Sequence, residues 1–267
     1  MPTHIATCHH LFPDAHRCGS PALRGETICY YHHPQPRPPS QKPRVQKQPA
    51  IVDESNEFEP QLAAVRQLLA DCMAKPARAV SRFALLLLAL TAVRPNEVQN
   101  AEWSEIESID GPDPLWRIPA ARMKGDADRK ADDSGDHLVP LTPWAVAVIK
   151  ALRPLTGGYR LMFSSDRHVH RPISENTLRA LLIRAGYYQR HVPHGFRASF
   201  STIMNGWAQD HGREGDRAVI DLMLAHVPKN KVEGAYNRAA HMPRRRALAE
   251  AWAEMITVGL VVPGVEV

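Results

Sequence analysis

Residues 194–197 place a proton-transfer group and a permanent cation three positions apart. His194 can gain or lose a proton near neutral pH, and the guanidinium of Arg197 can donate paired hydrogen bonds to phosphate oxygens. Residues three apart on a helix lie on one face, so a helix here would turn both side chains the same way. The pair indicates phosphoryl chemistry, although an isolated His-x-x-Arg pattern is more often structural.

Four further residues supply the other groups that handling a phosphate requires. They are two cations, a second imidazole and a phenol: Arg94, Lys124, His226 and Tyr236. Lys130 lies in the same connecting segment as Lys124 and is the alternative lysine. Taken singly, each cation is explained as a surface residue and the tyrosine as a core residue. Two arginines, a lysine, two histidines and a tyrosine together form a complete set for phosphate chemistry.

The ordered series Arg, Lys, His-x-x-Arg, His, Tyr resembles the active site of the tyrosine recombinases, the phage-type integrase family. The resemblance covers residues 60–258, and the text at residues 91–98, 194–200 and 224–226 is similar to integrases of satellite phages and genomic islands. It implies a mainly α fold with a small antiparallel β-sheet (α+β), the DNA breaking-rejoining enzyme fold.

The resemblance also implies a reaction. Tyr236 would attack the scissile phosphate, form a 3′-phosphotyrosyl link and release a 5′-hydroxyl. A phenol has a pKa of about 10 and needs help to lose its proton, so His194 is the expected base or relay, and Lys124 would protonate the departing oxygen. The remaining residues would bind the phosphate: Arg94, Arg197 and His226. No cofactor is expected for catalysis, because the covalent link conserves the energy for rejoining.

The function that follows from the resemblance is site-specific integration or excision of a mobile element. The expected partners are double-stranded DNA, further copies of the chain in a tetramer on DNA, and accessory DNA-bending or excision factors. A cytoplasmic, nucleoid-associated protein is expected. Two alternatives stay open: a type IB topoisomerase-like activity, and a truncated, inactive integrase that acts as a DNA-binding protein. The intact residue set argues against the second, whereas the lack of room for a preceding core-binding domain argues for it.

A second cluster of reactive residues lies in the first 33 positions. It combines three cysteines with a close Cys-x-x-His spacing: Cys8, Cys18, Cys29 and His32, with His33 as the alternative histidine. Three thiolates and an imidazole close the shell of a structural zinc ion, and a metal can supply folding energy to so short a segment. The alternative is a His- and Cys-rich tail without fixed ligands, because the cysteine spacings are longer than in common fingers.

Four regions are expected along the chain: a small zinc module (1–33), a proline-rich charged linker (34–60), the catalytic domain (61–258) and a tail (259–267). The apolar spacing predicts a helix from Gln61 and a second over residues 77–92. The second is apolar nearly all round and therefore central to the core. Arg94 follows it, and Pro95 suits the first turn of the next helix.

Two short alternating segments, residues 116–119 and 137–141, predict the strands of a hairpin whose connection carries Lys124. Further helices are expected over residues 143–152, after Ser174 as an N-cap, from His194 to Met204, and over the apolar positions 248–256. In the family such a terminal helix docks on a neighbouring subunit, so we expect a second copy to cover it.

Bulk composition permits this interpretation. The 267 residues are 44% hydrophobic, which allows one good-sized core and a small appendage. A net charge of +5 and a pI of 9.1 allow a polyanionic partner. The longest apolar stretch, residues 83–93, is shorter than the roughly 20 residues of a membrane span, so no membrane partner is expected. Three of the four cysteines fall in the first thirty residues, which favours a reduced metal cluster over a disulfide framework.

Overall fold

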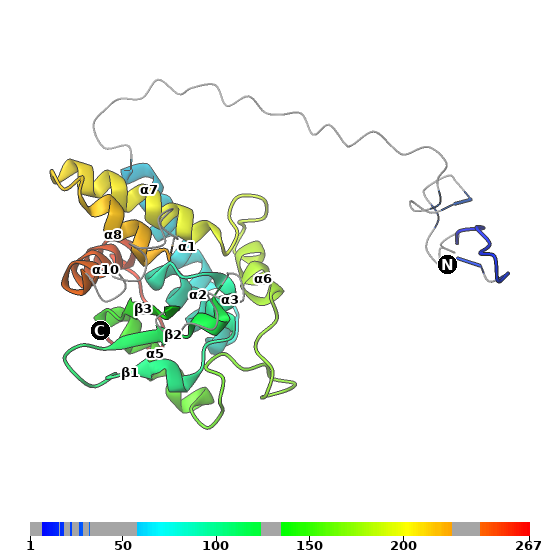
Figure 1. Cartoon of the computed structure of the whole chain (residues 1–267), viewed down its shortest axis with the longest axis horizontal. Helices are drawn as coiled ribbons and strands as arrows, with labels where there is room; N and C mark the ends of the chain where they lie inside the picture. Colours follow the sequence, from blue (N-terminus) through cyan, green and yellow to red (C-terminus); the bar gives the residue numbers. More distant parts are fainter. Residues whose placement is uncertain are drawn as a thin grey trace, which may run out of the picture. The chain divides into compact units, whose positions relative to one another are not determined.

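A computed structural model describes residues 7–15, 17–18, 22, 27–28, 32, 58–123, 135–225 and 241–267 (Figure 1). The chain divides into two units, residues 1–51 and 52–267. All helices and strands named below belong to the second unit. The predicted linker, residues 34–60, lies almost entirely outside the described residues, so its boundaries stay a prediction.

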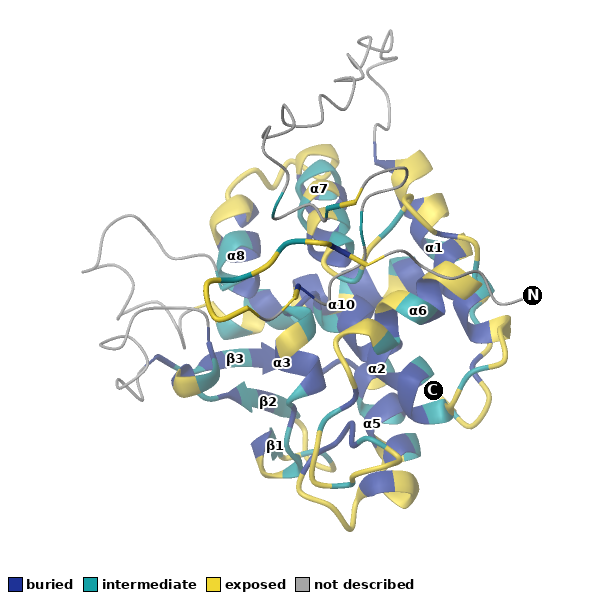
Figure 2. Cartoon of the chain, turned by 90° about the vertical axis from the view of Figure 1, so that its right-hand side faces the viewer, coloured by how far each residue is buried: buried dark blue, intermediate teal, exposed yellow. Residues whose placement is uncertain are grey.

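The second unit is built around α2 (Ala79–Thr91), which buries ten of its thirteen residues. Its leucine-rich sequence is apolar on every side, and a helix of that kind is stable only when other elements surround it. Figure 2 shows α2 largely buried, and α1 (Glu59–Ala74), α5 (Pro143–Thr156) and α6 (Asn176–Arg184) pack against it. The predicted central helix is confirmed.

The turn after α2 determines where Arg94 stands. Ala92 ends the helix in the left-handed conformation, with φ of 49°, and its N–H donates to the carbonyl of Leu88 at 2.9 Å. An alanine in this conformation costs free energy that the surrounding structure must offset. The chain then enters α3 (Pro95–Gln99), whose first residue is the proline that the sequence predicted there.

The sheet has three antiparallel strands in the order β1 (Ile106–Glu107), β2 (Leu115–Ile118) and β3 (His137–Pro140). Trp116 is opposite Ile106 on one side and Val139 on the other. Two 3-10 turns adjoin the strands along the chain: η2 (Trp103–Glu105) precedes β1, and η3 (Ala120–Arg122) follows β2. The predicted hairpin is confirmed as β2 and β3, whereas β1 was not foreseen because two residues carry no readable alternation.

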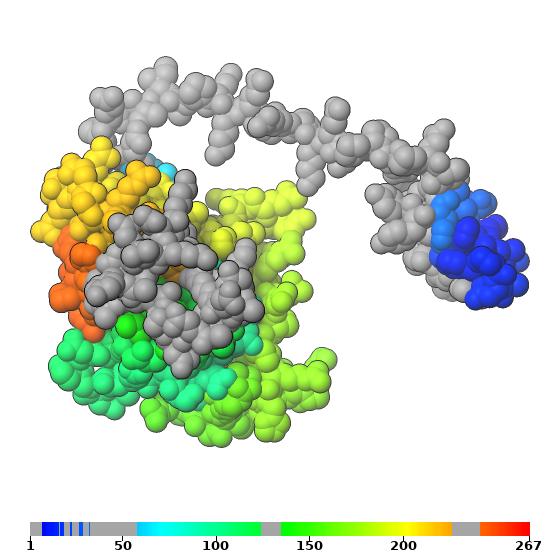
Figure 3. Space-filling view, viewed as in Figure 1, coloured from blue at the N-terminus to red at the C-terminus, as the bar shows by residue number. Residues whose placement is uncertain are grey.

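The C-terminal layer consists of α7 (Gly195–Asp210), α8 (Asp216–Met223) and α10 (Met242–Thr257) (Figure 1). Leu248, Trp252 and Ile256 of α10 are buried in the core of their own unit, and Trp252 Nε1 donates to the Ala89 carbonyl of α2 at 2.8 Å. The expectation that a neighbouring copy covers this helix is therefore wrong, because α1, α2 and α8 of the same chain cover it. Figure 3 shows the C-terminal helices (yellow to orange) beside the green surface of the sheet region.

Two predicted helix boundaries are corrected. The predicted helix 143–152 continues to Thr156 and includes Pro154, and the Gly157 N–H closes its last turn by donating to the Arg153 carbonyl at 2.8 Å. The helix expected after Ser174 begins at Asn176 with Glu175 as its N-cap, and Ser174 Oγ instead lies 3.2 Å from Thr177 Oγ1. The predicted fold class, mainly α with a small antiparallel sheet, is confirmed. No helix in the described part of the chain is long and apolar enough to cross a membrane.

Candidate active site

Arg197 projects from the first turn of α7 into the interior and is 5% exposed. Its Nη1 donates to the Ala92 carbonyl at 2.8 Å and its Nη2 to the Leu224 carbonyl at 2.5 Å. Ala92 lies two residues before Arg94, and Leu224 lies two residues before His226. One guanidinium thus links the three segments that hold predicted phosphate-binding residues.

Arg94 lies beside Arg197, as the N-cap of α3. Its backbone N–H donates to Glu97 Oε2 at 2.7 Å, and its Nη1 donates to Glu97 Oε1 at 3.0 Å. Glu97 is 2% exposed, whereas the Arg94 side chain is 21% exposed and reaches the surface. The buried carboxylate therefore orients Arg94 from behind and leaves part of its guanidinium open.

Arg197 keeps its charge in this setting. Burial, and then the positive charge of Arg94, lower the pKa of Arg197 to about 10, and the Glu97 carboxylate acts in the opposite direction. The guanidinium is still protonated at neutral pH. Within the described residues no carboxylate forms an ion pair with Arg197, since both of its hydrogen-bond acceptors are backbone carbonyls. Its charge is available to a ligand.

His194 is the N-cap of α7, with an exposed side chain and helical backbone angles of −67° and −20°. The prediction that His194 and Arg197 share the first turn of a helix is confirmed. Gly195 between them packs against His191: a Cβ at this position would lie 2.9 Å from the His191 ring, which itself packs edge-on against Phe196. Any larger residue at position 195 would clash with the His191 ring, so close packing at this point requires glycine.

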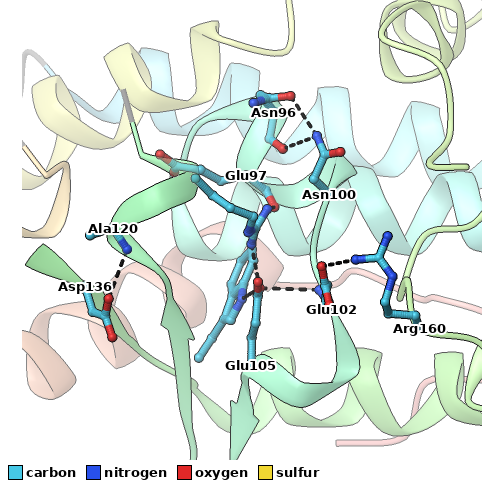
Figure 4. A network of polar contacts seen from close by, with 10 residues as sticks. Asn96, Glu97, Asn100, Glu102, Glu105, Ala120, Asp136 and Arg160 are labelled. Carbon is cyan, nitrogen blue, oxygen red and sulfur yellow. Dashed lines mark hydrogen bonds and ion pairs between the residues drawn. The ribbon is translucent and has the colours of Figure 1, made fainter. Parts of the chain in front are cut away.

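A buried polar network supports α3 and the end of the sheet (Figure 4). Arg122 Nη2 donates to Glu105 Oε2 at 2.5 Å, and its Nη1 donates to the Glu97 carbonyl at 3.3 Å. Trp116 Nε1 donates to the same Glu105 oxygen at 2.9 Å. Burial raises the pKa of Glu105, while the hydrogen bond from Trp116 and the charge of Arg122 act against that rise. The network fixes η3 relative to α3, whose N-cap is Arg94.

Arg122→Ala is expected to lower the free energy of unfolding by about 2 kcal/mol, because the buried Glu105 carboxylate loses its cation. Arg160→Ala is the matched control, since Arg160 pairs with Glu102 at the surface (Figure 4). There the expected loss is below about 1 kcal/mol. Urea denaturation measures both losses, and equal losses would contradict the role assigned to the buried pair.

Lys124 and the alternative Lys130 lie outside the described residues, but both ends of the connection that carries them are held. The backbone N–H of Ala120 donates to Asp136 Oδ1 at 2.9 Å (Figure 4). The network around Arg122 fixes the entry to the connection two residues before Lys124.

His226 and Tyr236 also lie outside the described residues, and the flanking helices are again fixed. Arg244 at the start of α10 binds both carboxylate oxygens of Asp216 in α8, with Nε 2.7 Å from Oδ1. Arg245 is buried and donates to a backbone carbonyl of β3. Of the six predicted active-site residues, the structure describes three and brings two, the arginines, together; the chemical roles of all six stay predictions.

His137, the first residue of β3, was not foreseen as part of this region. It is buried, and burial lowers its pKa to about 3. The positive charges of Arg245, Arg197 and Arg94 act in the same direction, and a hydrogen bond with the backbone of Met223 opposes them. A neutral imidazole therefore packs among the guanidiniums. The sequence signal was its place on the inward face of a predicted strand.

The free energy of unfolding is expected to fall as the pH drops below 6.5. An unfolded chain protonates His137 near that value, while the folded chain keeps it neutral down to about pH 3. Between these two pH values the unfolded state binds more protons than the folded state. His137 therefore lowers the free energy of unfolding by up to about 1.4 kcal/mol for each unit that the pH falls. Urea denaturation at several pH values should show a smaller slope in His137→Gln. The exposed control His168→Gln should keep the wild-type slope, and identical slopes in all three proteins would contradict the account.

In the N-terminal unit three of the predicted metal ligands, Cys8, Cys18 and His32, lie together, with their ligand atoms within 4.8 Å of one another. Cys29 and the alternative His33 lie outside the described residues.

Comparison with known proteins identifies similar chains. The sequence profile of the Phage integrase family matches residues 61–242. Prophage integrase IntA of Escherichia coli (strain K12) is 38% identical over 167 residues, which are 62% of this chain and 36% of that protein. The integrase of Enterobacteria phage P4 is 32% identical over 197 residues, or 71% of this chain and 43% of that protein. The chain thus spans less than half the length of these two relatives.

Solved structures are similar at lower identity. A XerH site-specific recombinase bound to its difH substrate in a pre-cleavage complex is 15% identical, with a TM-score of 0.47, over 68% of this chain and 51% of that one. XerA recombinase is 17% identical, with a TM-score of 0.46, over 82% of this chain and 67% of that one. The family profile covers more than half of the sequence, and the chain belongs to the phage integrase family.

Proposed function

We propose that the chain is the catalytic part of a site-specific DNA recombinase, which cleaves and rejoins DNA through a 3′-phosphotyrosine intermediate during integration or excision of a mobile element. The observation that supports this most is the approach of two arginines: the buried Arg197 binds the Ala92 carbonyl, two residues before Arg94, and the positive charge of Arg94 acts on it. Among the described residues, Glu97 is the carboxylate that balances part of this charge. Two neighbouring cations with one counter-charge favour the binding of an anion. A phosphodiester is such an anion.

In this reaction the phenolic oxygen of Tyr236 attacks phosphorus, and the bond from phosphorus to the 5′-oxygen breaks. His194 takes the phenolic proton, and Lys124 gives a proton to the departing oxygen. The reverse attack, by a 5′-hydroxyl of another strand, releases the tyrosine and joins the DNA. The order of the six residues along the chain and membership of the integrase family support these roles.

The two arginines and His226 bind the non-bridging oxygens while the phosphorus is pentavalent. A guanidinium has N–H donors on all three nitrogens, and Arg197 uses one on Nη1 and one on Nη2 for backbone carbonyls. Among the described residues nothing accepts from its Nε or from the second N–H of each terminal nitrogen, so these donors are proposed to bind a phosphate. Because backbone carbonyls hold the cation in place, little reorganisation is needed as charge develops, which is the most effective form of electrostatic catalysis.

Double-stranded DNA is the proposed partner. The net charge of +5 favours a polyanion, and phosphate contacts make such affinity salt-dependent while carrying little sequence information. Exchange of strands between two duplexes needs several active sites, so we propose that copies of the chain assemble on DNA as a tetramer. Accessory DNA-bending or excision factors would set the direction of the reaction.

A pool of nicked duplexes of random sequence tests this function. The nick lets the short 5′-hydroxyl fragment diffuse away after attack, which traps the protein on DNA as a complex stable in detergent. Wild type should form this complex and Tyr236→Phe should not. The exposed Tyr188 provides the control, and Tyr188→Phe should behave as wild type. A complex that persists in Tyr236→Phe would contradict the proposal, and plasmid relaxation without recombinant products would favour the type IB topoisomerase alternative.

A further inference from the structure

We propose that Cys8, Cys18 and His32 bind a structural zinc ion that folds the N-terminal unit. This site is separate from the proposed DNA chemistry and does not depend on it. The three side chains come from positions up to 24 residues apart, yet their ligand atoms lie within 4.8 Å of one another. Two thiols and an imidazole are the ligand types that zinc prefers in structural sites.

The separation of the ligand atoms fits a tetrahedral ion. Zinc–sulfur bonds of about 2.3 Å and zinc–nitrogen bonds of about 2.0 Å place a sulfur and a nitrogen ligand about 3.5 Å apart, and two sulfurs about 3.8 Å apart. Cys8 Sγ lies 3.6 Å from His32 Nδ1. Since no pair of the three ligand atoms is more than 4.8 Å apart, closing the site shortens no separation by more than about 1.3 Å.

The backbone around the cysteines holds them in position. The N–H of Cys18 donates to the His10 carbonyl at 2.9 Å, and the N–H of His9 donates to the Thr27 carbonyl at 2.8 Å. Leu11 and Arg17, which lie between Cys8 and Cys18 in the sequence, form an antiparallel β-bridge with each other. These bonds fold the chain back on itself and bring the segments that carry Cys8 and Cys18 together.

The imidazole of His32 is held by aromatic rings. It stacks on His10, with ring centroids 3.7 Å apart and planes 13° from parallel, and meets Phe12 edge-on at 5.4 Å. A histidine whose ring is fixed in this way presents one nitrogen in a defined direction, as metal ligands require. The group of ligand atoms within 4.8 Å of one another contains His32 and not His10, so we assign His10 to supporting the ring of His32.

The described residues of the N-terminal unit offer little else to stabilise it. Cys8 is 1% exposed, and the apolar cluster around the two sulfurs contains, among the described residues, only Phe12 and Ile28 besides the cysteines. So small a cluster removes too little apolar surface from water to offset the entropy of ordering the chain. A bound metal supplies that free energy directly. The sequence offers Cys29 as a fourth ligand, and this residue lies outside the described part of the chain.

Zinc content of the full-length chain is the first test. Purified without chelators in reducing buffer, wild type should retain about one zinc ion per chain, measured by inductively coupled plasma mass spectrometry. Cys8→Ser, Cys18→Ser and His32→Gln should each lose most of it. Two matched controls should retain it: His9→Gln, which removes an exposed histidine of the same unit, and Cys72→Ala. Cys72 is buried in α1, where burial raises its pKa to about 12.

A second measurement on wild type does not depend on whether the variants fold. Co²⁺ added to the zinc-free chain should give the intense visible bands of tetrahedral cobalt, together with a thiolate-to-cobalt charge-transfer band, and Zn²⁺ should displace it. Two results would overturn the proposal: zinc content that is the same in Cys8→Ser as in wild type, or absence of metal together with a Cys8–Cys18 disulfide in the intact mass. Neither result bears on DNA cleavage, so this test is independent of the function proposed for the second unit.

Discussion

Arg197→Lys is expected to lower the rate of DNA strand cleavage by about a thousandfold. The arginine holds two backbone carbonyls, of Ala92 and Leu224, and still has donors for a phosphate. A lysine ammonium is a single point of charge that cannot span both carbonyls and the ligand. The substitution would therefore remove the proposed phosphate contact and would also loosen the segments that hold Arg94 and His226.

Single-turnover cleavage of the nicked substrate measures this effect, and DNA affinity measured alongside it separates binding from chemistry. Arg213→Lys is the control, because Arg213 is an exposed arginine in the loop after α7. It should cleave as wild type. We expect affinity for DNA to fall much less than cleavage in Arg197→Lys, since an arginine aimed at developing charge acts mainly in the transition state. Cleavage within about threefold of wild type would contradict the role given to Arg197.

Trp252→Ala is expected to lower the free energy of unfolding by about 3 to 5 kcal/mol. The indole is fully buried, packs edge-on against Phe200 at 5.3 Å, and donates to the Ala89 carbonyl of the central helix. Truncation leaves a cavity and an unpaired carbonyl at the point where α10 meets α2. Since α10 fixes one end of the segment that carries Tyr236, cleavage activity should fall with stability.

Urea denaturation of Trp252→Ala at two protein concentrations separates docking within one chain from docking between copies. Packing within the chain predicts the same loss at both concentrations, whereas docking on a second copy would make the loss depend on concentration. Glu254→Ala, an exposed position on the same helix, should change stability by less than about 0.5 kcal/mol. A loss below about 1 kcal/mol in Trp252→Ala would show that the helix is not held as described.

Local patterns predicted much of the fold. The apolar run of α2, the proline at the start of α3 and the alternation of β2 and β3 each reflect contacts between residues near in sequence. The pairing of Arg94 with Arg197 was also predicted, because their order along the chain matches a family pattern. Its structural cause, a guanidinium bound to a carbonyl 105 positions away, has no local signature.

Other features depend on contacts that no local pattern specifies. The apolar positions of α10 show that one face of the helix must be buried, but they do not show which element buries it. The sequence prediction therefore assigned that face to a second copy, whereas α1, α2 and α8 of the same chain cover it. Buried polar residues such as His137 and Glu105 alternate like ordinary strand and turn residues. Three guanidiniums determine the electrostatic environment of His137, and Arg122 and Trp116 determine that of Glu105.

The identity of the residue that becomes attached to DNA tests the central claim most directly. Wild-type chain trapped on the nicked substrate is digested with protease and nuclease, and the peptide that retains a nucleotide is sequenced by mass spectrometry. The account predicts a nucleotide joined through its 3′-phosphate to Tyr236, and a 5′-hydroxyl on the released strand. Attachment at any other residue, or a 5′-phosphate link to the tyrosine, would contradict it.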